Sequence, residues 1–167
     1  KEPIDSQYEL FKKYDKFWRD EFIKLKNHCD KTEIEFLSTP FDLESAYFLN
    51  DLMDVFKVSS SDITNKPFIE YICDFGKPII LSTGMNTLES VGKAVDIFEN
   101  AKVPYVLLHT TNLYPTPPHL VRLGAMVELA EAFPKALVGL SDHTEDNLAC
   151  LGAVALGASV LERHFTD

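Results

Sequence analysis

Residues 137–164, LVGLSDHTEDNLACLGAVALGASVLERH, contain two short apolar runs of strand length, Leu137 to Asp142 and Ser159 to His164. Between the two runs, Asn147 to Leu156 has the apolar spacing of a helix. A strand, a helix and a second strand in this order form the repeating unit of a parallel sheet. This stretch therefore predicts an α/β fold.

The same unit recurs towards the start of the chain. Further helical spacing precedes the first apolar run, from about Tyr8 to Cys29. Four more runs have strand length: Ile34 to Thr39, Val55 to Ser60, Ile79 to Gly84 and Tyr105 to Thr111. The stretches with helical spacing that follow them are Leu43 to Leu52, Pro67 to Phe75, Leu88 to Asn100 and Leu120 to Phe133. We therefore predict six parallel strands with helices between them.

All six apolar runs end in polar residues. The number of such polar ends distinguishes between two α/β folds. An open doubly wound sheet usually builds its site from two or three strand ends, whereas a barrel gathers every strand end around one mouth. Six polar ends favour a (β/α)8 TIM-type barrel. Because a complete barrel needs eight units and about 250 residues, the 167 residues predict an incomplete one.

The composition excludes some classes of partner. Sixteen Lys and Arg against 26 Asp and Glu give a formal net charge of −10, which argues against binding to nucleic acid. No window approaches the roughly 18 apolar residues of a membrane span, and no signal peptide is recognisable. We expect a cytoplasmic protein without a membrane partner and with reduced cysteines. Because residue 1 is Lys rather than Met and Asp167 follows directly on an apolar run, we expect residues 1–167 to be one partial domain from a longer polypeptide.

Two histidines are candidate metal ligands. Side chains alternate along a strand, so Ser141 shares a face with His143, and Glu162 shares a face with His164. If both histidines face the barrel axis, their imidazoles can bind one divalent cation such as Mn²⁺ or Mg²⁺. A pair of hydrogen-bonded histidines at the rim is the alternative. Glu162 favours the metal interpretation, because a carboxylate inside a barrel needs a cation, a metal-bound imidazole or a proton.

Lys57 interrupts an otherwise apolar run and is a candidate anion ligand. The alternative is a lysine that faces solvent from an edge strand. Next to Ser59, Ser60 and Ser61, its ammonium group can bind a phosphate or a carboxylate. Ser82 lies at a similar donor-rich strand end, where ordinary turn chemistry is the alternative. The sequence contains no phosphate-binding glycine motif and no serine-hydrolase elbow, so nucleotide binding and serine hydrolysis have no support.

Several longer motifs occur in order from about Phe36 to Asp167. They are FLSTPF at 36–41, FGKPIILSTGM at 75–85, LYPTP at 113–117, VGLSDHT at 138–144, GAVALGA at 152–158 and LERHFT at 161–166. Together they resemble the N-acetylneuraminate (sialic acid) synthase family. The resemblance implies a (β/α)8 barrel, usually followed by an antifreeze-like domain. It also implies condensation of phosphoenolpyruvate with an N-acetylated amino sugar such as N-acetylmannosamine, with Mn²⁺ or Mg²⁺ as cofactor.

The resemblance also implies roles for individual residues. His143 and His164 would bind the metal, and we assign catalytic roles to Lys57 and Glu162. The residues expected to hold phosphoenolpyruvate are Thr39, Lys57, Ser60, Ser82, Asn112 and Ser141, and those expected near the acceptor sugar are Phe41, Asp62 and Tyr114.

Some features leave alternatives open. Many family members have Gly-Ser-Gly and an acid, often Glu, where this chain has Ser59-Ser60-Ser61-Asp62, so legionaminate or pseudaminate synthesis is an alternative. Two further alternatives are a related phosphoenolpyruvate-dependent synthase of a keto acid phosphate and a non-catalytic barrel that binds a sugar or a metal. The match begins at the third strand of the family's barrel, so we expect the first two strands and the antifreeze-like domain to be absent. The full-length enzyme is expected to be a homodimer, and the isolated chain to be inactive.

Overall fold

The computed structural model describes residues 6–165. These residues belong to two compact units, which divide between Phe36 and Leu37. In the first unit, helix α1 (Gln7–Tyr14) is followed by helix α2 (Arg19–Lys31). The prediction of one helix from Tyr8 to Cys29 is therefore wrong, because the chain leaves the helix after Tyr14 and starts a new one. The carboxylate of Glu21 accepts a hydrogen bond from the Trp18 backbone N–H at 3.0 Å and so caps the start of α2.

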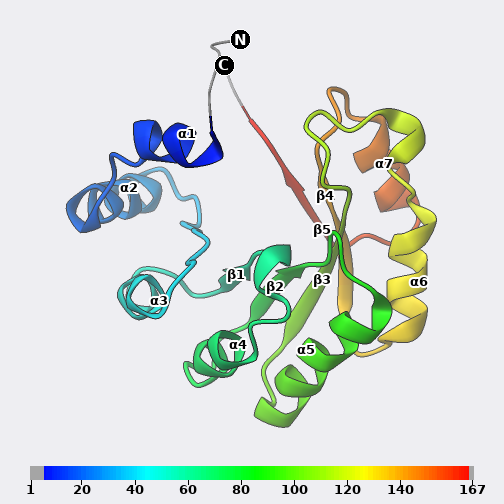
Figure 1. Cartoon of the computed structure of the whole chain (residues 1–167), viewed down its shortest axis with the longest axis horizontal. Helices are drawn as coiled ribbons and strands as arrows, with labels where there is room; N and C mark the ends of the chain where they lie inside the picture. Colours follow the sequence, from blue (N-terminus) through cyan, green and yellow to red (C-terminus); the bar gives the residue numbers. More distant parts are fainter. Residues whose placement is uncertain (1–5, 166–167) are drawn as a thin grey trace. The chain divides into compact units, whose positions relative to one another are not determined.

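The second unit contains a parallel five-stranded sheet in the order β1-β2-β3-β4-β5. Its strands are β1 (Phe56–Val58), β2 (Ile79–Ser82), β3 (Tyr105–Thr110), β4 (Leu137–Asp142) and β5 (Val160–Arg163). The helices are α3 (Leu43–Asn50), α4 (Lys66–Cys73), α5 (Leu88–Ala101), α6 (Gly124–Ala132) and α7 (Leu148–Ala155), with short 3₁₀-helices η1 (Ser60–Asp62) and η2 (Pro118–Leu120). Helices α4 to α7 flank one side of the sheet (Figure 1).

The sheet curves into a half-barrel. Strands β1 and β5 are its two edges, and in a flat sheet four steps of about 4.8 Å would separate them by about 19 Å. Nevertheless, Nζ of Lys57 on β1 lies 3.4 Å from Oε2 of Glu162 on β5. Only a curved sheet brings these two side chains together, and this curvature agrees with part of a TIM-type barrel. The parallel strands with helices between them confirm the α/β class.

The predicted strand at Ile34 to Thr39 is absent from the part of the chain that the structure describes. A strand requires hydrogen bonds with a neighbouring strand, and the backbone N–H of Ser38 instead points to the sulfur of Met53 at 3.0 Å. The described sheet therefore has five strands rather than the six that we predicted.

Apolar side chains buried between the sheet and its helices form the core of this unit. Phe56, Leu81 and Leu107 are fully buried, as is Phe98 of α5. Between β4 and β5, a Cβ atom on Gly139 would lie 2.1 Å from the carbonyl oxygen of Val160, so only glycine allows this close approach. No helix among the described residues is long and apolar enough to cross a membrane.

Candidate active site

A chain of polar contacts crosses the concave face of the half-barrel. The ammonium of Lys57 donates a hydrogen bond to Oγ of Ser82 at 2.8 Å and forms the 3.4 Å ion pair with Glu162. The other oxygen of Glu162 accepts a hydrogen bond from Oγ of Ser141 at 2.7 Å. The curvature of the sheet thus gathers residues of β1, β2, β4 and β5 into one cluster, which we call the inner cluster.

The burial of Lys57 makes this cluster chemically unusual. Lys57 is only 6% exposed, although its strand lies at the edge of the sheet. Burial lowers the pKa of Lys57, and the negative charge of Glu162 opposes this effect. The solvent-facing alternative for Lys57 is therefore wrong.

A cavity of about 230 Å³ opens beside the inner cluster. Besides Lys57, Ser141 and Glu162, it is lined by Thr39, His143 and His164 among others. Three of the six expected anion ligands, Thr39, Lys57 and Ser141, therefore share one cavity with the two expected metal ligands. A buried ammonium next to several hydroxyl donors suits a small anionic substrate.

The two histidines lie at adjacent strand ends and face each other. Their ring centroids are 5.4 Å apart, and the ring of Tyr114 stacks on His143 with a centroid distance of 3.9 Å. Nδ1 of His143 lies 2.9 Å from the carbonyl oxygen of Thr111. Because a carbonyl can only accept, Nδ1 is the donor in this contact, and Nε2 is the nitrogen left for a metal.

The donor set fits a divalent cation that keeps oxygen ligands. Two imidazoles can supply two nitrogen ligands. Among residues 6–165, no group of three or more His, Cys, Asp or Glu side chains is arranged to hold a metal ion. The remaining positions would therefore be filled by water or substrate oxygens, as Mn²⁺ and Mg²⁺ accept.

Ser60 and Asn112 meet in a second small cluster of polar residues. Nδ2 of Asn112 lies 3.4 Å from Oγ of Ser60, and the buried Oδ1 of Asn112 has no hydrogen-bond partner. A Cβ atom on Gly84 would lie 1.9 Å from this Oδ1, so the glycine makes room for the amide. Asn86, which the sequence analysis did not identify as a site residue, donates a hydrogen bond to the Ser60 carbonyl at 3.0 Å.

Two expected sugar contacts are not joined to these clusters by any contact described. The side chain of Phe41 is 65% exposed. The carboxylate of Asp62 lies 3.4 Å from Oγ of its neighbour Ser61. Their roles remain predictions.

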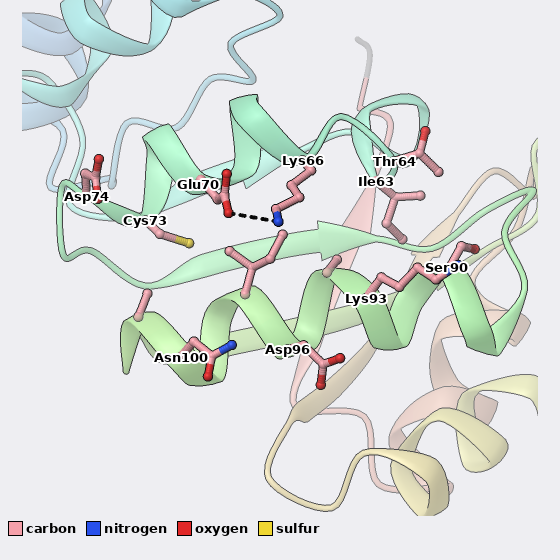
Figure 2. Close-up of a pocket in the computed structure, with 13 residues that line it drawn as sticks. Ile63, Thr64, Lys66, Glu70, Cys73, Asp74, Ser90, Lys93, Asp96 and Asn100 are labelled. Carbon is pink, nitrogen blue, oxygen red and sulfur yellow. Dashed lines mark ion pairs between the residues drawn. The ribbon is translucent and has the colours of Figure 1, made fainter.

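A larger hollow lies elsewhere, on the outer helix layer. It is a groove of about 670 Å³ between α4 and α5, which we call the outer groove. Figure 2 shows Lys66 and Glu70 paired at its rim and Cys73 beside them. The outer groove is lined mainly by residues of α4 and α5, and none of the expected site residues lines it.

The fold and the inner cluster define a class of protein: a β/α-barrel protein with a buried lysine and a histidine pair at its strand ends. Residues 1–167 match the NeuB family along the whole chain, and the chain belongs to this family. The match includes the first 35 residues, which the motifs in the sequence did not cover.

Three relatives illustrate the similarity. The N,N'-diacetyllegionaminic acid synthase of Campylobacter jejuni is 48% identical over 143 residues, which are 83% of this chain and 42% of that protein. The N-acetylneuraminate-9-phosphate synthase of Drosophila melanogaster is 34% identical over 161 residues, 95% of this chain and 43% of that protein. The N-acetylneuraminic acid synthetase structure from Leptospira borgpetersenii superposes with a TM-score of 0.86 at 33% identity, covering 90% of this chain and 53% of that one. The chain thus spans about half the length of these relatives.

Proposed function

We propose that the whole protein is a nonulosonic acid synthase. It condenses phosphoenolpyruvate with N-acetylmannosamine or a related 2-acetamido sugar and releases phosphate. The observation that carries this proposal is the buried Lys57, held between Ser82 and Glu162 in the same cavity as the histidine pair. The relatives named as synthases of such sugar acids support the same reaction class.

The inner cluster supplies what an anionic substrate needs. Lys57 offers a desolvated positive charge to phosphoenolpyruvate, and Thr39, Ser82 and Ser141 offer hydroxyl groups around it. Glu162 compensates the buried charge when the substrate is absent and keeps the ammonium oriented. Ser60 and Asn112 extend this set of donors.

The reaction joins the two substrates by one carbon–carbon bond. C3 of phosphoenolpyruvate attacks the aldehyde carbon of the open-chain sugar, water adds to C2, and phosphate leaves with rupture of its C–O bond. A divalent ion held by His143 and His164 would supply a Lewis acid for the sugar oxygens. We assign Tyr114, whose ring stacks on His143, to contact with the acceptor.

The identity of the acceptor is the finer part of the proposal. The 48% identity to a synthase of N,N'-diacetyllegionaminic acid favours a sugar with two acetamido groups as the second candidate. A phosphorylated acceptor would need another basic group at the mouth. Arg163 offers little for this purpose, because its guanidinium donates to the carbonyl of Thr144 at 2.9 Å and to Asn147 at 2.8 Å.

Release of phosphate by the whole protein tests the proposal. The protein is incubated with phosphoenolpyruvate, Mn²⁺ or Mg²⁺, and one acceptor at a time. The acceptors are N-acetylmannosamine, a diacetamido deoxy sugar, arabinose 5-phosphate and erythrose 4-phosphate. We expect turnover with one of the acetamido sugars. Turnover with a sugar phosphate alone would assign the related synthase class, and no turnover with any acceptor would favour a non-catalytic barrel.

A further inference from the structure

An ion pair lies behind the histidine pair, on the helix side of the sheet. The register of β4 and β5 places Asp142 opposite Arg163. Side chains alternate along a strand, so these two side chains point away from the face that carries the histidines. His143 follows Asp142 and His164 follows Arg163, which places one histidine beside each member of the ion pair.

Asp142 is a buried carboxylate whose two oxygens are both used. Its side chain is 1% exposed, and Nη1 of Arg163 lies 3.4 Å from Oδ2. Oδ1 accepts a hydrogen bond from the backbone N–H of Thr144 at 2.9 Å, and Oδ2 accepts one from the Thr144 hydroxyl at 3.0 Å. The thiol of Cys150 on α7 lies 3.3 Å from the same oxygen. The carboxylate therefore holds the start of the turn between β4 and α7.

Arg163 holds the same turn from the neighbouring strand. Its guanidinium donates to the Thr144 carbonyl at 2.9 Å, to Oδ1 of Asn147 at 2.8 Å and to the carbonyl of Asp146. These contacts tie the end of β5 to the residues that follow His143. The end of β5 itself continues into His164.

We propose that Asp142 and Arg163 are a positioning pair that sets the separation and orientation of the His143 and His164 rings. This inference rests on the proposed function, because it assigns the pair a task in the metal site of that reaction. A positively charged, planar group that binds two points of the turn restrains it better than a flexible ammonium would. Outer partners of this kind typically change metal affinity by about 10- to 100-fold when they are altered.

The test uses the whole protein and three variants. Arg163→Lys keeps the charge but loses the planar guanidinium. Asn147→Ala removes one of its partners without uncapping α7, because Asn147 makes no side-chain cap there. Lys135→Gln is the control, because it breaks an ion pair with Glu99 of 2.6 Å remote from the strand ends. Melting temperatures establish that each variant is folded.

Two measurements read the position of the rings. The ring nitrogens of ¹⁵N-labelled histidines are observed by NMR in metal-free protein, and the binding of Mn²⁺ is measured by calorimetry. In Arg163→Lys we expect shifted ring signals for His143 and a Kd for Mn²⁺ raised about tenfold or more. The signals of His109, which is buried with Nε2 2.6 Å from the carbonyl oxygen of Val121, should not change. Asn147→Ala should show a smaller change in the same direction, and Lys135→Gln none.

The inference is overturned if the His143 signals match those of the wild type in both Arg163→Lys and Asn147→Ala. If Arg163→Lys does not fold, the signals of Asn147→Ala decide. Failure of the wild type to bind Mn²⁺ would instead overturn the metal site of the proposed function. The ring signals would still decide whether the pair positions the histidines.

Discussion

The inner cluster and the outer groove each contain a Lys–Glu ion pair with the same N–O distance, 3.4 Å, but in opposite environments. The side chain of Lys57 is 8% exposed, whereas that of Lys66 is 69% exposed. An exposed pair of this kind contributes about 0 to 1 kcal/mol, because water and salt screen it. A buried charge interacts strongly with its surroundings and with any substrate that reaches it.

The comparison also shows that size does not identify the site. The outer groove is larger than the cavity of the inner cluster, about 670 against 230 Å³. Function depends on where the fold removes water from charged groups. In the half-barrel this happens at the strand ends of the concave face.

The largest expected effect concerns the histidines. His143→Ala and His164→Ala should each abolish metal-dependent turnover, because two nitrogen ligands cannot be replaced by one imidazole and water. Calorimetry with Mn²⁺ and the phosphate-release assay measure both consequences. His119→Ala in η2 is the control, because its side chain is exposed and we assign it no role. Unchanged Mn²⁺ binding in both variants would show that the histidines are not metal ligands.

The next effect compares the two lysines directly. Lys57→Met should raise the KM for phosphoenolpyruvate roughly ten- to 100-fold, because a lost charge-assisted contact costs about 1.5 to 3 kcal/mol. The KM for the sugar should change less. Lys66→Met should leave both constants within about twofold, since its ion pair is exposed. Equal effects of the two substitutions would contradict the distinction between the regions.

The same burial predicts the pH dependence of stability. Burial lowers the pKa of Lys57 in the folded protein below its value in the unfolded chain. Between these two pKa values the unfolded state binds more protons, so the contribution of Lys57 to the free energy of unfolding rises with pH. Urea denaturation across the alkaline range should show this rise in the wild type and a smaller one in Lys57→Met. Identical pH profiles would mean that Lys57 is not desolvated.

Local rules predict only part of the geometry around the inner cluster. Alternation along the strands placed Ser141 with His143 and Glu162 with His164, and the βα repeat brought their strands next to each other. Burial of Lys57 could not be read from its run alone. It results from the curvature that brings β1 and β5 together.

Two of the errors concern contacts between residues far apart in sequence. The run from Ile34 to Thr39 has strand composition, but strand formation depends on a neighbour, and its Ser38 points to Met53. The partner of Arg163 was also not predicted, because the pairing with Asp142 requires the β4–β5 register. Local propensity predicts neither the missing strand nor the pairing of Asp142 with Arg163.

A smaller effect on turnover is expected from two glycines, Gly84 beside the Ser60–Asn112 cluster and Gly92 in α5. Gly84→Ala would place a Cβ atom 1.9 Å from Oδ1 of Asn112 and so displace the amide from Ser60. We expect a KM for phosphoenolpyruvate raised several-fold and a loss of about 1 to 3 kcal/mol in stability. Gly92→Ala in α5 meets Phe133 at an ordinary 3.7 Å and should stabilise its helix by about 0.5 to 1 kcal/mol without changing KM. Urea denaturation and steady-state kinetics compare the two variants. A KM raised in Gly92→Ala but not in Gly84→Ala would contradict this prediction.

The smallest effect on turnover is expected at the outer groove itself. Burial raises the pKa of the Cys73 thiol to about 11, so little thiolate is present near neutral pH. In a protein whose other cysteines are replaced by serine, alkylation of Cys73 by iodoacetamide should therefore be slow at pH 8. Its rate should rise about 100-fold by pH 10, because only the thiolate reacts. The modified protein should keep its full rate of phosphate release, since the outer groove lies in the helix layer and none of the expected site residues lines it. A loss of turnover that follows the extent of alkylation, with the melting temperature unchanged, would show that this groove communicates with the reaction.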